Sequence, residues 1–103
     1  MTETNSGAWR KRLAEKYGDG YVLRQLAEEA CELGQAALKL VRARRGETPV
    51  QAPEAEERLI EEMADVLVMA EIALVCLREG AEESIAAVAA GKCRRMRKRM
   101  LNE

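Results

Sequence analysis

Apolar residues recur at spacings of three and four along most of the chain, which is the pattern of one face of an α-helix. The pattern is clearest between residues 21 and 44, where the apolar positions are Leu23, Leu26, Ala30, Leu33, Ala37 and Leu40. We therefore predict a long helix over about 21–44. A shorter helix is predicted before it, over about 6–17, with Asn5 or Ser6 as its N-cap. The intervening Gly18-Asp19-Gly20 predicts a turn.

Two more helices are expected in the second half of the chain. Pro53 suits the first turn of a helix and Gly80 suits the position after its end, so we predict a helix over about 53–79. A fourth helix is predicted over about 81–101 from the apolar positions Ile85, Ala89, Cys93, Met96 and Met100. Both prolines lie in or next to the segment 45–52, which is the expected loop.

Composition supports an all-α fold with one domain over residues 1–103. Apolar residues make up 48% of the chain and charged ones 34%, and phenylalanine is absent. Four helices with mostly short connections predict a four-helix bundle. A chain of 103 residues is at the small end for burying a self-sufficient core, so a partner chain would help to complete the bundle.

Charge and cysteine content limit the classes of function. The formal net charge of −1 gives no general attraction to nucleic acid. The three cysteines are odd in number and form no CxxC pair, which argues against disulfides or a thiolate zinc site. The longest apolar run, 72–77, is far too short for a membrane span, and the N-terminus lacks the features of a signal peptide. We expect a cytoplasmic protein that does not bind membranes.

An acidic motif occurs twice, as EEACE at 28–32 and as EEMAD at 61–65. At about 100° per residue, Glu29 and Glu32 share a boundary of the apolar face of their helix. On the third helix, Glu62 projects between Met69 and Ala73, and Asp65 projects among apolar residues too. The segment 66–77 is apolar on nearly all sides, with Glu71 as its only polar residue, so we expect it to be buried on several sides.

A single ExxE pair on a helix is usually a solvated face supported by pairs such as Glu54 with Arg58. Two pairs on adjacent helices, one of them among apolar side chains, need compensating positive charge. Arg58 and Arg78 are the only bases on the third helix. A divalent cation would supply the charge, and an all-carboxylate ligand set suits Mg²⁺ or Mn²⁺. The absence of histidine excludes the ExxH pattern of di-iron bundles.

The two motifs, Glu29-x-x-Glu32 and Glu62-x-x-Asp65, resemble the ExxE…ExxD signature of the MazG-like, all-α nucleoside triphosphate pyrophosphohydrolases. The segments LAEEACELGQAALKL and LIEEMADVLVMAEIAL resemble the surrounding sequence of that family, and the basic positions near the C-terminus resemble the last helix of its small phage and bacterial members. The similarity covers roughly residues 17–100. The interval between the two motifs is long for the signature, so the loop is expected to be an insertion.

The resemblance implies an enzyme that binds Mg²⁺ through Glu29, Glu32, Glu62 and Asp65. It also implies cleavage of a (d)NTP between its α and β phosphorus atoms, which would clean the nucleotide pool. Single-domain relatives commonly form homodimers or homotetramers, which fits the apolar third helix.

Further roles follow from that expected chemistry. Glu29 or Glu32 would accept the proton of the attacking water, with Glu28 or Glu61 as a second choice. Lys92, Arg95 and Arg99 share a face of the fourth helix and would bind phosphate oxygens. Gln25, Tyr21 and Trp9 are the weaker candidates for contacting the base. The alternative to an enzyme is a regulator that binds nucleotide without turnover, or a helical adaptor that binds nucleic acid through its basic C-terminal helix.

Overall fold

Four α-helices and one short 3₁₀ helix make up residues 7–103, the part of the chain that this computed structural model describes. The elements are α1 (Ala8–Tyr17), α2 (Asp19–Arg44), α3 (Ala52–Ala73), η2 (Leu74–Cys76) and α4 (Ala81–Leu101). Because the described range contains no β-strand, the predicted all-α class is confirmed. None of its helices has the combination of length and apolar character that a bilayer span requires.

The helix boundaries differ from the prediction at two places. The turn expected at 18–20 is confined to Gly18, which has a φ of 91°, because Asp19 and Gly20 already belong to α2. The third helix ends at Ala73 and not near 79. After it, the chain tightens into η2 and then extends at Leu77, which apolar periodicity does not reveal. The N-cap expected at Asn5 or Ser6 lies outside the described residues.

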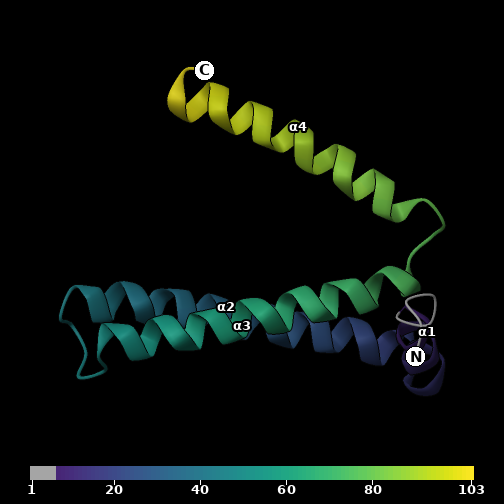
Figure 1. The fold of residues 1–103 in the computed structure, drawn as a ribbon, viewed down its shortest axis with the longest axis horizontal. Helices are drawn as coiled ribbons and strands as arrows, with labels where there is room; N and C mark the ends of the chain where they lie inside the picture. The colour runs from purple at the N-terminus through teal and green to yellow at the C-terminus, as the bar shows by residue number, and fades with distance from the viewer. Residues whose placement is uncertain (1–6) are drawn as a thin grey trace.

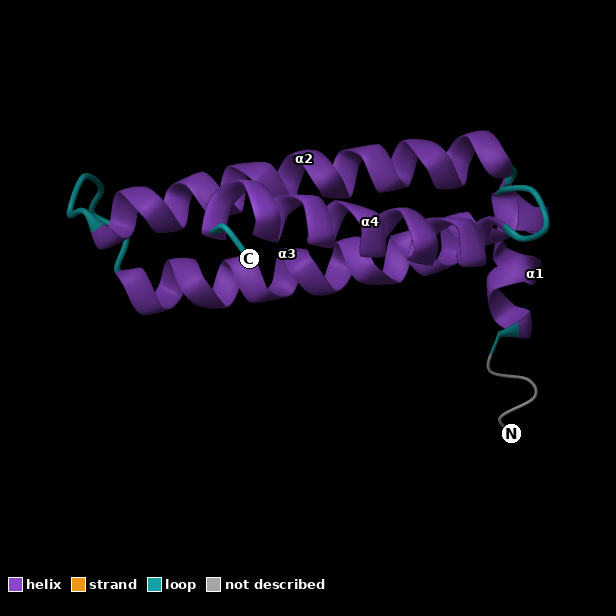
Figure 2. Cartoon of the chain, turned by 90° about the horizontal axis from the view of Figure 1, so that it is seen from above, coloured by secondary structure: helices purple, strands orange, loops and turns teal. Residues whose placement is uncertain are grey.

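Helices α2 and α3 form an antiparallel hairpin, and α1 packs across the end where α2 begins and α3 ends (Figure 1, Figure 2). The hydrophobic core lies at this end and consists of Ala14, Val22, Ile72 and Ala73, with Leu13, Leu26, Met69 and Cys76 packed against it. Ala36, Leu40 and Ala55 are buried nearer the loop end. Ala36 and Ala55 are small, so they need little space between the two helices. The hairpin therefore holds the two acidic motifs in a fixed relation.

The two faces of the hairpin differ in polarity. Helix geometry places Gln25, Glu32 and Lys39 of α2 on one face together with Arg58, Glu61 and Asp65 of α3. We call it the carboxylate face. The opposite face, here called the apolar face, carries Leu23, Leu38 and Val41 of α2 and Met63 and Leu67 of α3, all of which are exposed. The expectation that 66–77 is buried on several sides is therefore wrong within one chain, since Leu67 is 67% exposed.

Helix α4 stands apart from the hairpin. It leaves at the α1 end and diverges (Figure 1), and from above it runs over α2 and α3 (Figure 2). Right-handed helix geometry puts it on the side of the apolar face. Within residues 7–103 it makes no extensive contact with another helix, and the apolar side chains of Val88, Met96 and Met100 are more than half exposed. One chain thus forms a hairpin with a detached helix, and not a closed bundle.

Local hydrogen bonds set the direction in which α4 leaves. Gly80 adopts the left-handed conformation with a φ of 85°, which favours glycine. The Ala81 amide donates to the Arg78 carbonyl at 3.1 Å, and the Ser84 amide donates to the Gly80 carbonyl at 3.1 Å. The Arg78 guanidinium also donates to the Ser84 hydroxyl at 3.3 Å. The contacts of Arg78 with Ala81 and Ser84 therefore connect the start of α4 to the segment before it.

Candidate metal centre

Three carboxylates from two helices converge on the carboxylate face. Glu29 and Glu32 come from α2 and are less than one turn apart, and Glu62 comes from the middle of α3. One oxygen of each lies within 4.8 Å of one oxygen of each of the others. The antiparallel pairing of α2 with α3 produces this convergence, because it brings the middle of each helix to the same level. Three of the four predicted ligands therefore share one place.

Glu62 is a buried carboxylate of which only one oxygen has a partner in the described residues. It is the only buried charged residue in the described part of the chain, at 3% exposure. Its Oε1 atom is buried and accepts no hydrogen bond from any described residue, and the same holds for Oε2 of Glu29. Its other oxygen, Oε2, lies 2.9 Å from Nη2 of Arg58. An ionised carboxylate left half-satisfied in this way is costly, and a bound cation would remove the cost.

Both of these carboxyl groups bind protons more tightly than usual. Burial raises the pKa of Glu29 above its ordinary value of 4.5, and the negative charges of Glu32, Asp65 and Glu62 raise it further. Burial also raises the pKa of Glu62, although the guanidinium of Arg58 opposes the rise. Burial and the neighbouring acids therefore both favour the protonated form of these carboxyl groups in the folded chain.

Asp65 is the exception among the predicted ligands. Its side chain is exposed, so the expectation that it projects into apolar surroundings is wrong. The reason is that Asp65 lies at the edge of the arc by which α3 faces α2, whereas Glu62 lies near its centre. Asp65 is still close enough for its charge to raise the pKa of Glu29 and of Glu62. It therefore lies beside the three converging carboxylates.

The residues present fit a hard divalent cation. The donor set consists only of carboxylate oxygens, which Mg²⁺ and Mn²⁺ prefer, and two of these oxygens are buried without a partner. Glu29, Glu32 and Glu62 would hold the ion, and Asp65 stands next to them. The second-choice proton acceptors lie outside this group. Glu28 accepts a hydrogen bond from Gln25 at 3.1 Å, and Glu61 is exposed.

The candidate base-binding residues are separated by the structure. The rings of Tyr17 and Tyr21 stack with their centroids 5.0 Å apart, and both are exposed. Tyr21 and Gln25 share the side of α2 that carries Glu32. Trp9 instead lines a small cavity of about 170 Å³ together with Leu67 and Val68, next to the apolar face. Of the three candidates, only Tyr21 and Gln25 are brought to the carboxylate face.

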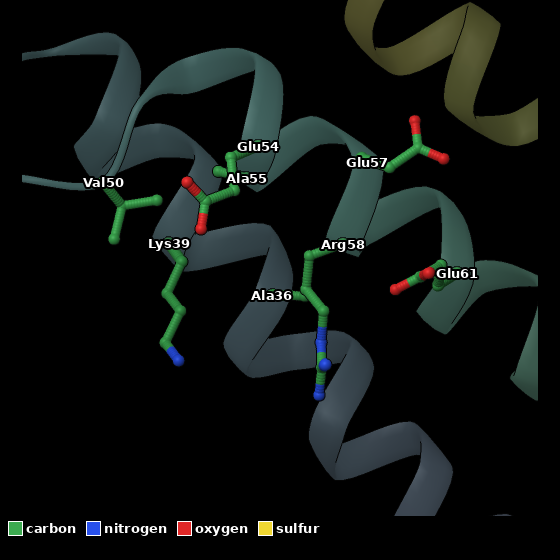
Figure 3. A pocket seen from close by; sticks show the side chains of 8 residues that line it. All are labelled: Ala36, Lys39, Val50, Glu54, Ala55, Glu57, Arg58 and Glu61. Carbon is green, nitrogen blue, oxygen red and sulfur yellow. The ribbon is translucent and has the colours of Figure 1, made fainter.

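The predicted phosphate-binding cations do not meet the carboxylates of their own chain. Lys92, Arg95 and Arg99 are exposed on α4, which lies over the apolar face, whereas the carboxylates open on the other side. Nearer cations were missed by sequence reasoning. Arg58, expected to pair with Glu54, pairs with Glu62 instead, and with Lys39 it lines a cavity of about 620 Å³ between α2 and α3 (Figure 3). The i,i+4 spacing of Arg58 and Glu62 was the available signal.

Comparison of the chain with protein-family models, curated proteins and solved structures gives no match.

Proposed function

We propose that the protein is a Mg²⁺-dependent nucleoside triphosphate pyrophosphohydrolase that converts a (d)NTP into the monophosphate and pyrophosphate. The observation that carries the proposal is the convergence of Glu29, Glu32 and Glu62, with two buried carboxylate oxygens lacking a partner. The motif resemblance adds the reaction type. Such an enzyme would act on the nucleotide pool of the cytoplasm.

The residues of the hairpin have separate tasks in this reaction. When bound, Mg²⁺ would offset the charge of the triphosphate and of the pyrophosphate that leaves. Glu29, Glu32 and Glu62 would hold the ion, and Asp65 would stand beside them. Glu29 or Glu32 would accept the proton of the attacking water, because both carboxylates belong to the converging group. Tyr21 and Gln25 lie along the same side of α2, where a base could stack or be read.

A second copy of the chain completes the proposed site. The hairpin of the second copy would lie between the apolar face and α4 of the first copy. The apolar faces of the two hairpins would be in contact. The carboxylate face of the second copy then points toward α4 of the first. One side of α4 carries Ala81 and Ser84, the least exposed residues of its first turn. The same side continues with Val88, Lys92, Arg95 and Arg99, at spacings of three or four. The phosphate-binding cations would thus serve the partner's site.

The direct test is release of pyrophosphate from a panel of ribo- and deoxyribonucleoside triphosphates, with and without Mg²⁺. We expect release from at least one nucleotide, dependent on Mg²⁺ or Mn²⁺. A folded, metal-loaded protein that releases none would refute the enzyme. Calorimetry then separates the alternatives, since nucleotide binding without turnover indicates a regulator, and salt-sensitive DNA binding indicates a nucleic-acid adaptor.

A further inference from the structure

Arg58 pairs with a buried carboxylate although its own side chain is mostly exposed to solvent. Its guanidinium lies 2.9 Å from Oε2 of Glu62, a side chain that is 4% exposed, while the Arg58 side chain itself is 62% exposed. The pair therefore joins a buried carboxylate, whose other oxygen has no partner in the described residues, to a cation that reaches open solvent. Because most of the Arg58 side chain is exposed, its guanidinium can move away from Glu62 without disturbing the hydrophobic core.

The cavity beside the pair offers a destination for the guanidinium. It has a volume of about 620 Å³, within the range of small-molecule sites, and lies between the loop-side halves of α2 and α3. In Figure 3 the side chains of Arg58 and Lys39 extend in the same direction across this space, while Glu57 points away. Lys39 is exposed and forms no ion pair within residues 7–103. Two cations from two helices therefore border this cavity, and the acids Glu54, Glu57 and Glu61 line it too.

We propose that Arg58 is an exchangeable counter-cation: it neutralises Glu62 while the metal is absent, and when the metal binds it turns with Lys39 to hold the polyphosphate of the nucleotide. A divalent ion and a guanidinium compete for the same carboxylate oxygen, so occupation by the metal releases the arginine. A guanidinium released next to a triphosphate finds oxygens that match its fork-shaped donor geometry. This assignment rests on the proposed function for its ligand, a nucleoside triphosphate.

The exchange predicts effects of opposite sign in one variant. Without nucleotide, Arg58→Gln removes a competitor and should tighten Mn²⁺ binding several-fold, measured by electron paramagnetic resonance of free Mn²⁺. With saturating Mg²⁺, the same variant should bind inorganic triphosphate about tenfold more weakly, measured by calorimetry. Inorganic triphosphate is used because it lacks a base and therefore reports only on the polyphosphate contacts.

Two matched variants isolate the roles. Lys39→Gln should leave Mn²⁺ binding unchanged and weaken triphosphate binding. Arg44→Gln breaks the exposed pair between Arg44 and Glu56, 3.0 Å apart in the same hairpin, and should change neither quantity. Circular dichroism checks that each variant is folded. Without metal, Arg58→Gln should melt at a lower temperature than the parent, because Glu62 loses its counter-charge. Added Mg²⁺ should restore the parent melting temperature.

The outcomes separate the inference from the proposed function. If Arg58→Gln binds triphosphate as tightly as the parent, or binds Mn²⁺ more weakly, the exchange is refuted and Arg58 is a structural partner of Glu62. The same conclusion follows if the parent protein binds no triphosphate. Failure of the proposed function would instead appear as absence of pyrophosphate release by the parent, whatever the two binding measurements give.

Discussion

The α2–α3 hairpin and helix α4 have similar apolar patterns but different surroundings. In the hairpin, apolar residues meet each other across two helices and bury one carboxylate among them. Helix α4 makes no extensive contact with another described helix, and apolar side chains of its stripe such as Met96 remain 54% exposed. A period of 3.6 residues therefore predicts the helix and its apolar side, but not which chain covers that side.

The largest effect is expected in the hairpin, from Glu62→Gln. The variant should lose activity by at least about 100-fold, because even the loss of groups that merely support a metal ligand costs 10–100-fold. Its melting temperature without metal should stay equal or rise, since repulsion among buried acids is relieved. The control is Glu71→Gln, an exposed acid on the same helix, which should keep parent activity. A fully active Glu62→Gln protein would remove Glu62 from the ligand set.

A mixing experiment connects the two regions. Glu62→Gln and the double variant Lys92→Ala/Arg95→Ala should each be inactive alone. Mixed in equal amounts under conditions that exchange subunits, they should recover about a quarter of parent activity, because half of the randomly paired dimers are hybrids with one intact site. No recovery, in dimers shown by differential tags to be hybrid, would mean that α4 serves its own hairpin.

The next effect concerns the side of α4 that is proposed to cover the second copy. Val88→Glu places a charge on the side proposed to cover the second copy and should convert the oligomer into a monomer, as measured by light scattering during gel filtration. Ala90→Glu puts the same charge on the opposite side of α4 and should leave the mass unchanged. A Val88→Glu protein with the parent mass would place the interface elsewhere.

The smallest effect is a dependence of stability on pH. Glu29 and Glu62 have a raised pKa in the folded chain, next to the acids Glu32 and Asp65 and the cation Arg58. Folded protein therefore holds protons that the unfolded chain has released, so their contribution to stability is present below about pH 4.5 and declines as the pH rises through the folded pKa values. Metal-free melting temperatures should fall over this range by a few degrees more than in a Glu29→Gln/Glu62→Gln variant. Equal slopes would contradict the raised pKa values.

Sequence patterns predicted most of the secondary structure and part of the site. The all-α class and the burial of Glu62 followed from periodicity, because both depend on residues near each other on one helix. The early end of α3 and the exposure of Asp65 did not. They depend on a 3₁₀ turn and on the rotation of α3 against α2, which tertiary packing determines. Spacing allows Arg58 to pair with Glu62, four residues after it, but also with Glu54, four residues before it. Spacing alone therefore does not choose between the two partners.

Gly80 has a consequence for how accurately α4 can be aimed. The helix contains 21 residues and at about 1.5 Å per residue forms a lever of about 30 Å. A change of about 10° at the base of such a lever moves its tip by about 5 Å, more than the length of a hydrogen bond. Gly80 carries no functional group, yet its left-handed conformation sets where Arg95 and Arg99 arrive. The reach of the most distant charges is therefore decided by a residue without a side chain.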